Sequence, residues 1–223
     1  MDKIILHAHS EWSHDSKITL ENWRIFMKKN SISMVYLTEH EESGWDQNKY
    51  EKFKSECTKY SCNKHKIIAG LELNISGYHI LAPNLKHYNG RPCDKEPKEI
   101  KKWVEKQSSI LIAAHPDKYR DFNSKILTNC HGIEIINTKH QYNWFFRRPT
   151  SRTQNLMLLF NLKPYVGQDI HRLSQYDLKG TMESLTGTLN DLYSVLFFKK
   201  ANFLNDFLIW IKNQCLFVYK LIK

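Results

Sequence analysis

The sequence predicts an α/β fold of the barrel type, in which parallel strands alternate with helices. Short apolar runs, typical of buried strands, alternate with longer segments whose apolar residues recur at helical spacing. Histidine or carboxylate residues stand at or just past the C-terminal ends of several of these runs, and in a parallel barrel those ends share the face where active sites are assembled. A length of 223 residues suits one large domain of this class.

The expected elements follow one another in a regular order. The apolar runs expected as strands are residues 4–6, 33–37, 66–71, 78–81, 109–114, 132–137 and 163–168. The segments with helical spacing are residues 19–30, 45–62, 94–107, 122–128 and 150–161. In the first helix, Leu20, Trp23, Phe26 and Met27 share one face and Thr19 is placed to cap the N-terminus. Pro116 should end the fifth strand.

The composition indicates which classes of partner the protein could bind and in which cellular compartment we expect it. Lysine and arginine exceed aspartate and glutamate by ten, so the surface should attract anions such as phosphoesters, nucleic acid or an acidic membrane face. The five cysteines form no C-x-x-C pair, which argues against a disulfide framework or a zinc ribbon and favours a reduced, cytoplasmic protein. No basic and apolar regions follow Met1, so we expect no export signal.

The C-terminal region is expected to differ from the barrel. We expect a catalytic barrel over residues 1–200 and an amphipathic helix over residues 201–223, packed on the barrel or extending from it. A contact of this helix with a membrane surface or a second copy is the alternative. Polar residues interrupt the apolar stretch 203–222, so we do not expect a helix that spans a membrane.

Potential metal ligands recur along the chain. His7 and His9 are two residues apart, which places both side chains on the same side of an emerging strand. Other ligand types at or just past strand ends are His40, Glu72, His115, Asp169 and His171. Imidazole nitrogens and carboxylate oxygens without a thiolate suit zinc, manganese or iron, and a shared carboxylate holds two such ions close together. These residues predict a polynuclear hydrolytic site.

A series of short motifs resembles a known family. In chain order the motifs are HAHS (7–10), SHDS (13–16), TEH (38–40), GLE (70–72), HIL (79–81), AHP (114–116), GIE (132–134) and GQDIH (167–171). Their order resembles that of the polymerase and histidinol phosphatase (PHP) superfamily, from residue 4 to about residue 172. The resemblance implies a distorted barrel of seven β/α units that carries two or three divalent ions (zinc, manganese or iron) at the C-terminal ends of its strands.

The resemblance also implies how the ligands divide among the ions. One ion would be held by His7, His9, Glu72 and Asp169. Glu72 would bridge to a second ion on His79 and His115, and a third would take Asp15, His40 and His171. Asp15 is preferred to its neighbour His14 because the family motif uses the carboxylate. Glu39 and Gln168 depart from residues common in the family, but neither position supplies a ligand, so the departures concern the tuning of the site.

Further residues are expected to support the chemistry. A hydroxide between two ions can attack phosphorus in line. Asp169, His171 and Glu72 are the catalytic candidates, with ligation as the main role and proton transfer by Asp169 or His171 as a second one. Glu134 should face the site and support a ligand, with a structural ion pair as the alternative. Cations that follow two strand ends either bind substrate phosphate or are solvated at the surface: Lys118, Arg120, Arg147, Arg148 and Arg152. The aromatic residues at 142–146 either pack a loop or stack on a base.

The leading hypothesis is therefore a metal-dependent phosphoesterase that acts on a phosphomonoester, either a small molecule or a nucleotide. Within the same superfamily, the alternatives are a 3′–5′ exonuclease or phosphodiesterase, which the positive charge favours, and a protein-tyrosine phosphatase. A hypothesis of another class is a non-catalytic domain that binds metal or docks a partner. The complete ligand set counts against it. The oligomeric state stays open.

Overall fold

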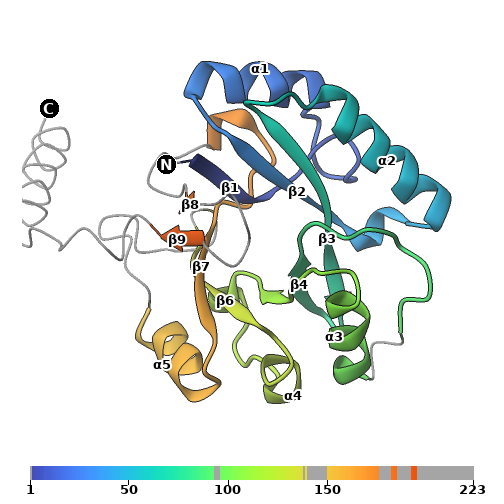
Figure 1. Cartoon of the computed structure of the whole chain (residues 1–223). Helices are drawn as coiled ribbons and strands as arrows, with labels where there is room; N and C mark the ends of the chain where they lie inside the picture. The colour runs from blue at the N-terminus through green and yellow to red at the C-terminus, as the bar shows by residue number, and fades with distance from the viewer. Residues whose placement is uncertain are drawn as a thin grey trace, which may run out of the picture.

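A nine-stranded sheet forms the centre of the molecule (Figure 1). The computed structural model describes residues 2–92, 96–137, 139 and 150–175, and the backbone of two short strands beyond them. The strands are β1 (Asp2–Ala8), β2 (Met34–His40), β3 (Lys66–Ile75), β4 (Tyr78–Ala82), β5 (Ile112–Ala113), β6 (Gly132–Asn137), β7 (Lys163–Gly167), β8 (Met182–Ser184) and β9 (Leu192–Ser194). Seven of them, β1 to β7, form a nearly closed barrel with helices around it, which confirms the predicted fold class.

The barrel closes between its first and last strands at the end that carries the predicted ligands. Ala8 at the end of β1 forms a parallel bridge with Ile170, just past β7. The His9 backbone N–H donates to Ile170 O over 2.9 Å. His9 and Asp169 are therefore drawn together by backbone hydrogen bonds next to them.

One strand runs against the expected direction. β1, β2 and β3 are parallel to one another, as are β5, β6 and β7, but β4 is antiparallel to both of its neighbours. The turn between β3 and β4 explains this, because Ser76 and Gly77 have φ values of 53° and 86°, as tight hairpin turns require. β3 continues past its expected end at 71 to pair with β4. His79 lies early in β4 and so still reaches the C-terminal face of the barrel.

The helices cover the outside of the sheet. They are α1 (Leu20–Asn30), α2 (Gln47–Tyr60), α3 (Pro97–Glu105), α4 (Ser124–Leu127) and α5 (Ser151–Leu159), with short 3₁₀ turns η1 (Glu41–Ser43), η2 (Pro116–Lys118) and η3 (Leu173–Gln175). The Thr19 side chain accepts the Asn22 N–H and caps α1 as expected. The α1 residues Leu20, Trp23 and Met27 are buried against the sheet. Each large apolar side chain buried in this way stabilises the fold by about 1.5–3 kcal/mol.

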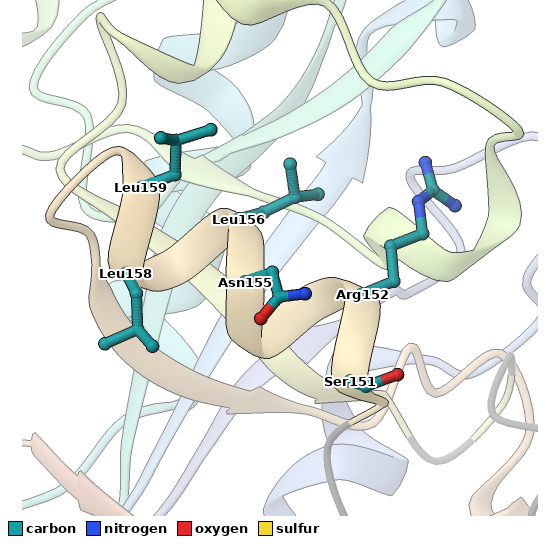
Figure 2. Close-up of a pocket in the computed structure, with 6 residues that line it drawn as sticks. All are labelled: Ser151, Arg152, Asn155, Leu156, Leu158 and Leu159. Carbon is teal, nitrogen blue, oxygen red and sulfur yellow. The ribbon is translucent and has the colours of Figure 1, made fainter.

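β5 is shorter than expected, and α5 leaves two leucines exposed. The fifth strand shrinks to Ile112–Ala113, and the Leu111 N–H just before it donates to the His131 side chain instead of to a neighbouring strand. α5 leaves Leu158 and Leu159 more than 70% exposed, beside an open surface pocket (Figure 2). None of the residues that line this pocket is a predicted metal ligand.

Several predictions fall on residues that the structure does not describe. These are the helix over 201–223, the aromatic residues at 142–146, and Arg147 and Arg148. In the part of the chain that is described, no helix has both the length and the hydrophobicity to cross a bilayer.

Candidate metal centre

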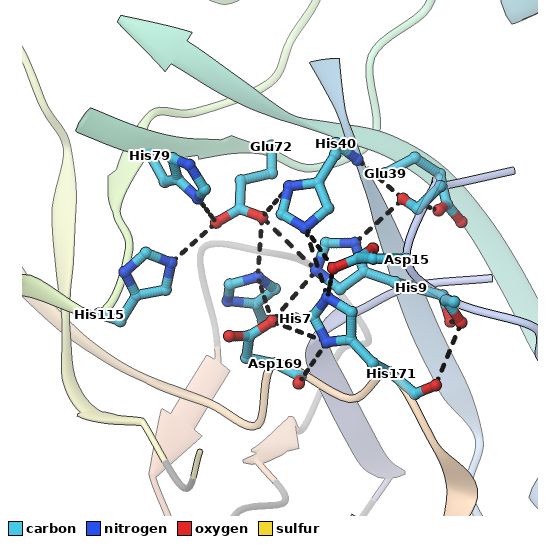
Figure 3. A network of polar contacts seen from close by, with 12 residues as sticks. His7, His9, Asp15, Glu39, His40, Glu72, His79, His115, Asp169 and His171 are labelled. Carbon is cyan, nitrogen blue, oxygen red and sulfur yellow. Dashed lines mark hydrogen bonds and ion pairs between the residues drawn. The ribbon is translucent and has the colours of Figure 1, made fainter. Parts of the chain in front are cut away.

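Four donor atoms from distant parts of the chain face one another at the C-terminal end of the barrel (Figure 3). His7 Nε2 lies 3.5 Å from Glu72 Oε2 and 3.6 Å from Asp169 Oδ1. His9 Nε2 lies 3.5 Å and 3.3 Å from the same two oxygens. These spacings suit a tetrahedral ion with bonds of about 2.0–2.2 Å, as zinc forms with imidazole and carboxylate groups.

Glu72 links this group to a second one. Its other oxygen, Oε1, lies 2.9 Å from His79 Nδ1 and 3.0 Å from His115 Nε2. The His79 backbone N–H donates to the Tyr119 hydroxyl oxygen over 2.9 Å, which anchors β4 beside the group. One carboxylate thus faces two sets of imidazoles through its two oxygens, in the arrangement that a bridging ligand requires.

A third group lies at the more exposed edge of the centre. Asp15 Oδ2 is 2.8 Å from His171 Nε2 and 3.4 Å from His40 Nε2, and the two Nε2 atoms are 3.3 Å apart. His14 instead is exposed and contacts Ser43 Oγ through Nδ1 over 3.3 Å. The structure therefore brings together all nine residues predicted as ligands, with Asp15 rather than His14 at the third group.

Glu134 contacts two of the predicted ligands, His7 and His115, and orients them. Its Oε1 lies 2.8 Å from His7 Nδ1, which leaves His7 Nε2 directed at the centre. Its Oε2 accepts the His115 backbone N–H over 2.7 Å. The space for this carboxylate exists because residue 167 is glycine: a Cβ there would lie 1.6 Å from Glu134 Oε1.

Glu39 supports the centre through two serines. It accepts hydrogen bonds from the Ser10 N–H, the Ser10 hydroxyl and the Ser13 hydroxyl at 2.5–3.1 Å. Ser13 Oγ in turn accepts the His40 backbone N–H over 2.9 Å and lies 3.3 Å from His9 Nδ1. Burial raises the pKa of Glu39 to about 7, although both serines oppose the shift.

The charges in the centre set the protonation of its ligands. Burial lowers the pKa of His9 to about 3. Burial also opposes a charge on His7, but the surrounding carboxylates, Glu134 foremost, outweigh it and hold the His7 pKa well above its usual value. Burial favours the neutral acid at Glu72, but nearby imidazoles, His7 foremost, hold the Glu72 pKa well below its usual value. Neutral His9 and ionised Glu72 are the forms that bind metal.

The backbone is strained at two ligands. His115 has a φ of 28° and Asp169 a φ of 51°, in the left-handed region that residues with a Cβ rarely adopt. Such conformations cost about 1–3 kcal/mol each and collect at functional sites. Here the strain accompanies side chains that are directed into the centre.

Buried donor atoms test whether the centre suits a cation. Among the described residues, the buried atoms His7 Nε2, His9 Nε2 and Glu72 Oε2 make no hydrogen bond of good geometry, although Glu72 Oε2 lies 3.0 Å from His40 Nδ1. A buried polar atom left unpaired costs about 1–3 kcal/mol. Because all three atoms face the same space, and the donors are imidazoles and carboxylates without a thiolate, the residues fit divalent metal ions.

The three predicted phosphate-binding cations that the structure describes make no hydrogen bond or ion pair with the predicted ligands. Lys118 and Arg120 are exposed, and Arg152 Nη1 donates to Tyr119 O. One cation that the sequence reasoning missed does reach the centre: Lys139 Nζ lies 3.1 Å from Asp169 Oδ2. Its position, two residues past the strand that carries Glu134, was the available signal.

Together, the barrel and its buried centre define a class of protein, the α/β barrels that gather histidines and carboxylates suited to divalent metal ions. A family model described as the PHP domain matches residues 6–203. The chain belongs to the PHP domain family, as its motifs predicted.

Solved structures share the fold at low sequence identity. A two-domain protein from Bacteroides vulgatus, which contains a predicted PHP-like metal-dependent phosphoesterase, matches with a TM-score of 0.57 and 21% identity. That match covers 78% of this chain and 53% of the other, so this chain spans about half of that protein's length. PsfC from Pseudomonas syringae matches with a TM-score of 0.56 and 16% identity, over 78% of this chain and 79% of the other. An amidohydrolase from Chromobacterium violaceum matches with a TM-score of 0.53 and 12% identity, over 75% and 87%. No curated protein matches the chain.

Proposed function

We propose that the protein is a metal-dependent phosphoesterase that hydrolyses phosphomonoesters with two or three divalent ions. The observation that carries this proposal is the position of Glu72, whose two oxygens face two separate sets of imidazoles. A carboxylate shared in this way is typical of centres that hold two ions close together for phosphoryl chemistry. Membership of the PHP domain family supports the same reaction class.

Each group of ligands would hold one ion. His7, His9 and Asp169 would bind the first, His79 and His115 the second, and Glu72 would bridge them. Asp15, His40 and His171 would bind the third. When bound, such ions lower the pKa of a coordinated water and neutralise phosphoryl oxygens. Zinc, manganese and iron all suit this donor set.

The other residues would orient the ligands and move protons. Glu134 fixes the His7 tautomer by accepting from Nδ1, and Glu39 fixes the backbone at His40 through Ser13. Asp15 is 37% exposed, so it lies where a leaving group could depart. His171 Nε2, at 2.8 Å from Asp15, can pass a proton to that edge when it is not bound to metal.

A phosphodiesterase or nuclease is the second candidate. The formal net charge of +10 would attract a polyanionic substrate, and it favours this activity over a tyrosine phosphatase. Diester turnover would separate the two candidates from each other.

A cytoplasmic location is proposed from the thiols. Cys57, Cys62 and Cys130 are free. Burial raises the pKa of the Cys130 thiol to about 12, and the Cys57 thiol is also buried with a raised pKa, so both are unreactive. Free buried thiols are typical of proteins from reducing compartments.

The first experiment combines elemental analysis with two substrates. The purified protein would be analysed for bound metal and then assayed with 4-nitrophenyl phosphate and bis(4-nitrophenyl) phosphate, with manganese or zinc added. We expect two or three ions per chain and turnover of the monoester. Preference for the diester would favour the nuclease candidate. If the protein neither binds metal nor hydrolyses either ester after reconstitution with metal, the proposal is refuted and a non-catalytic binding role is favoured.

A further inference from the structure

Lys139 is held in place beside the centre by the strand that carries Glu134. Its backbone N–H donates to Asn137 Oδ1 over 3.1 Å. The Asn137 side-chain amide donates to Glu134 Oε2 over 2.9 Å. The backbone at Lys139 is thus connected, through one side chain, to the carboxylate that orients His7.

The ammonium group of Lys139 lies between two predicted ligands and solvent. Its Nζ is 3.1 Å from Asp169 Oδ2 and 3.1 Å from His171 Nδ1. The other Asp169 oxygen, Oδ1, faces His9 Nε2 at 3.3 Å, so the two oxygens of one carboxylate serve different partners. The Lys139 side chain is 32% exposed, whereas that of Asp169 is 3% exposed.

The Lys139 ammonium group has more hydrogen-bond donors than the described residues around it have acceptors. It offers three donors, of which Asp169 Oδ2 accepts one and His171 Nδ1 accepts at most one more. His171 Nδ1 also lies 2.9 Å from Asp169 O, and the tautomer that donates to this carbonyl cannot accept from Lys139. Within the part of the chain that the structure describes, at least one Lys139 donor therefore has no acceptor and can serve a group that enters from solvent.

We propose that Lys139 binds a non-bridging phosphoryl oxygen of the substrate and so selects phosphate monoesters over diesters. A monoester carries two negative charges near neutral pH and a diester one, so a cation at the edge of the centre favours the monoester. The inference rests on the proposed function, because it assumes that the substrate's phosphoryl group enters this centre. A purely structural role would be limited to pairing with Asp169.

The test compares Lys139→Gln with Lys139→Arg and a matched control. Lys66→Gln removes the same charge from an exposed residue at the start of β3, at the opposite end of the barrel. For each metal-loaded protein we would measure metal content, KM and kcat for 4-nitrophenyl phosphate and bis(4-nitrophenyl) phosphate, and the Kd of inorganic phosphate by calorimetry.

We expect Lys139→Gln to raise the monoester KM and the phosphate Kd by about tenfold or more, and the diester KM by less than about threefold, with metal content unchanged. The monoester KM and the phosphate Kd of Lys139→Arg should stay within about threefold of the wild-type values. The same two constants for Lys66→Gln should equal those of the wild type. Equal increases for both esters, or lost metal with an unchanged phosphate Kd, would overturn the proposal.

The phosphate titration separates the two proposals. If the wild type hydrolyses neither ester, the proposed function fails, but weaker phosphate binding by Lys139→Gln would still support Lys139 as the anion-binding residue. If the wild type hydrolyses the monoester and Lys139→Gln keeps its KM and phosphate Kd, only the Lys139 assignment fails.

Discussion

The nine predicted ligands and the predicted cations Lys118 and Arg120 were both selected from the sequence, but the fold holds them in different ways. The ligand side chains are buried or nearly so, apart from Asp15 at 37% exposed, and each lies close to another ligand. Lys118 and Arg120 are exposed, and within the described residues their side chains make no hydrogen bond or ion pair. The ligands are thus positioned before any substrate arrives, whereas these cations must lose conformational freedom to act.

This difference predicts graded effects of substitution. Removing a ligand leaves buried charges without a partner and removes the site for an ion. Removing an exposed cation costs at most one contact that water can partly replace. The effects should therefore decrease from the ligands, through the residues that orient them, to the cations outside the centre.

The largest effect is expected for the double variant His7→Ala and His9→Ala. Both side chains are fully buried and both face Glu72 and Asp169, so their loss should abolish the first metal site and reduce hydrolysis by at least about 1,000-fold. The fold should persist, because the apolar core supplies most of the stability. Elemental analysis, activity assays and circular dichroism would measure these outcomes.

Two histidines outside the centre provide the control for that experiment. His65 Nδ1 contacts Ile32 O, and His131 contacts Leu111 N and Glu105. His65→Ala and His131→Ala should keep the metal content and the activity of the wild type. Full activity in the His7 and His9 double variant would remove this site from the mechanism.

A smaller effect is expected for Glu134→Gln. Glu134 contacts His7 directly and accepts the His115 N–H, so the amide should weaken metal affinity by about 10- to 100-fold. Glu39→Gln should weaken it less, because Glu39 acts through Ser13 and its pKa of about 7 means that it is already partly protonated at neutral pH. Metal titration with a competing chelator would rank the two, and equal affinities would contradict the distinction.

Gly167→Ala tests whether the position of the Glu134 carboxylate matters for metal binding. The added Cβ would lie 1.6 Å from Glu134 Oε1, so the carboxylate must move away from His7. We expect about tenfold weaker metal binding and a loss of stability of about 1–3 kcal/mol. Gly132→Ala is the control, because its Cβ would meet the Tyr165 ring 2.3 Å away and should reduce stability alone. Thermal unfolding and metal titration would be compared, and a similar loss of affinity in both variants would refute the specific role of Gly167.

How far the sequence predicts the molecule depends on how strictly the chain constrains each part. The strands around His7, His40 and Asp169 were predictable because apolar runs ended at ligand-type residues in a recurring order. The reversal of β4 depends on one tight turn at Ser76 and Gly77. The spacing of apolar residues does not indicate whether a strand is parallel or antiparallel to its neighbours. β8 and β9 are three residues each, too short for an apolar pattern.

Side chains in the loops were harder to place for a different reason. Lys139 reaches Asp169, whereas Lys118 and Arg120, chosen because they follow a strand end, make no hydrogen bond or ion pair with a described residue, and Lys118 Nζ lies over the Tyr119 ring at 5.9 Å. All three are long, flexible side chains that lie past a strand end, and sequence spacing does not fix where such a side chain ends. The buried ligands have fewer rotatable bonds, and the strands that carry them set their direction.

The smallest effect is expected for Arg152→Gln. Arg152 Nη1 donates to Tyr119 O, so its guanidinium helps to join α5 to the loop after β5 rather than facing the ligands. Its loss should lower stability by about 1 kcal/mol and change the monoester KM by less than about threefold. Chemical denaturation and steady-state kinetics would measure both quantities, with Lys139→Gln in parallel as the variant expected to change KM. A tenfold rise in KM for Arg152→Gln at unchanged metal content would show that a cation outside the centre reaches the phosphate, and the contrast between the two regions would then fail at this position.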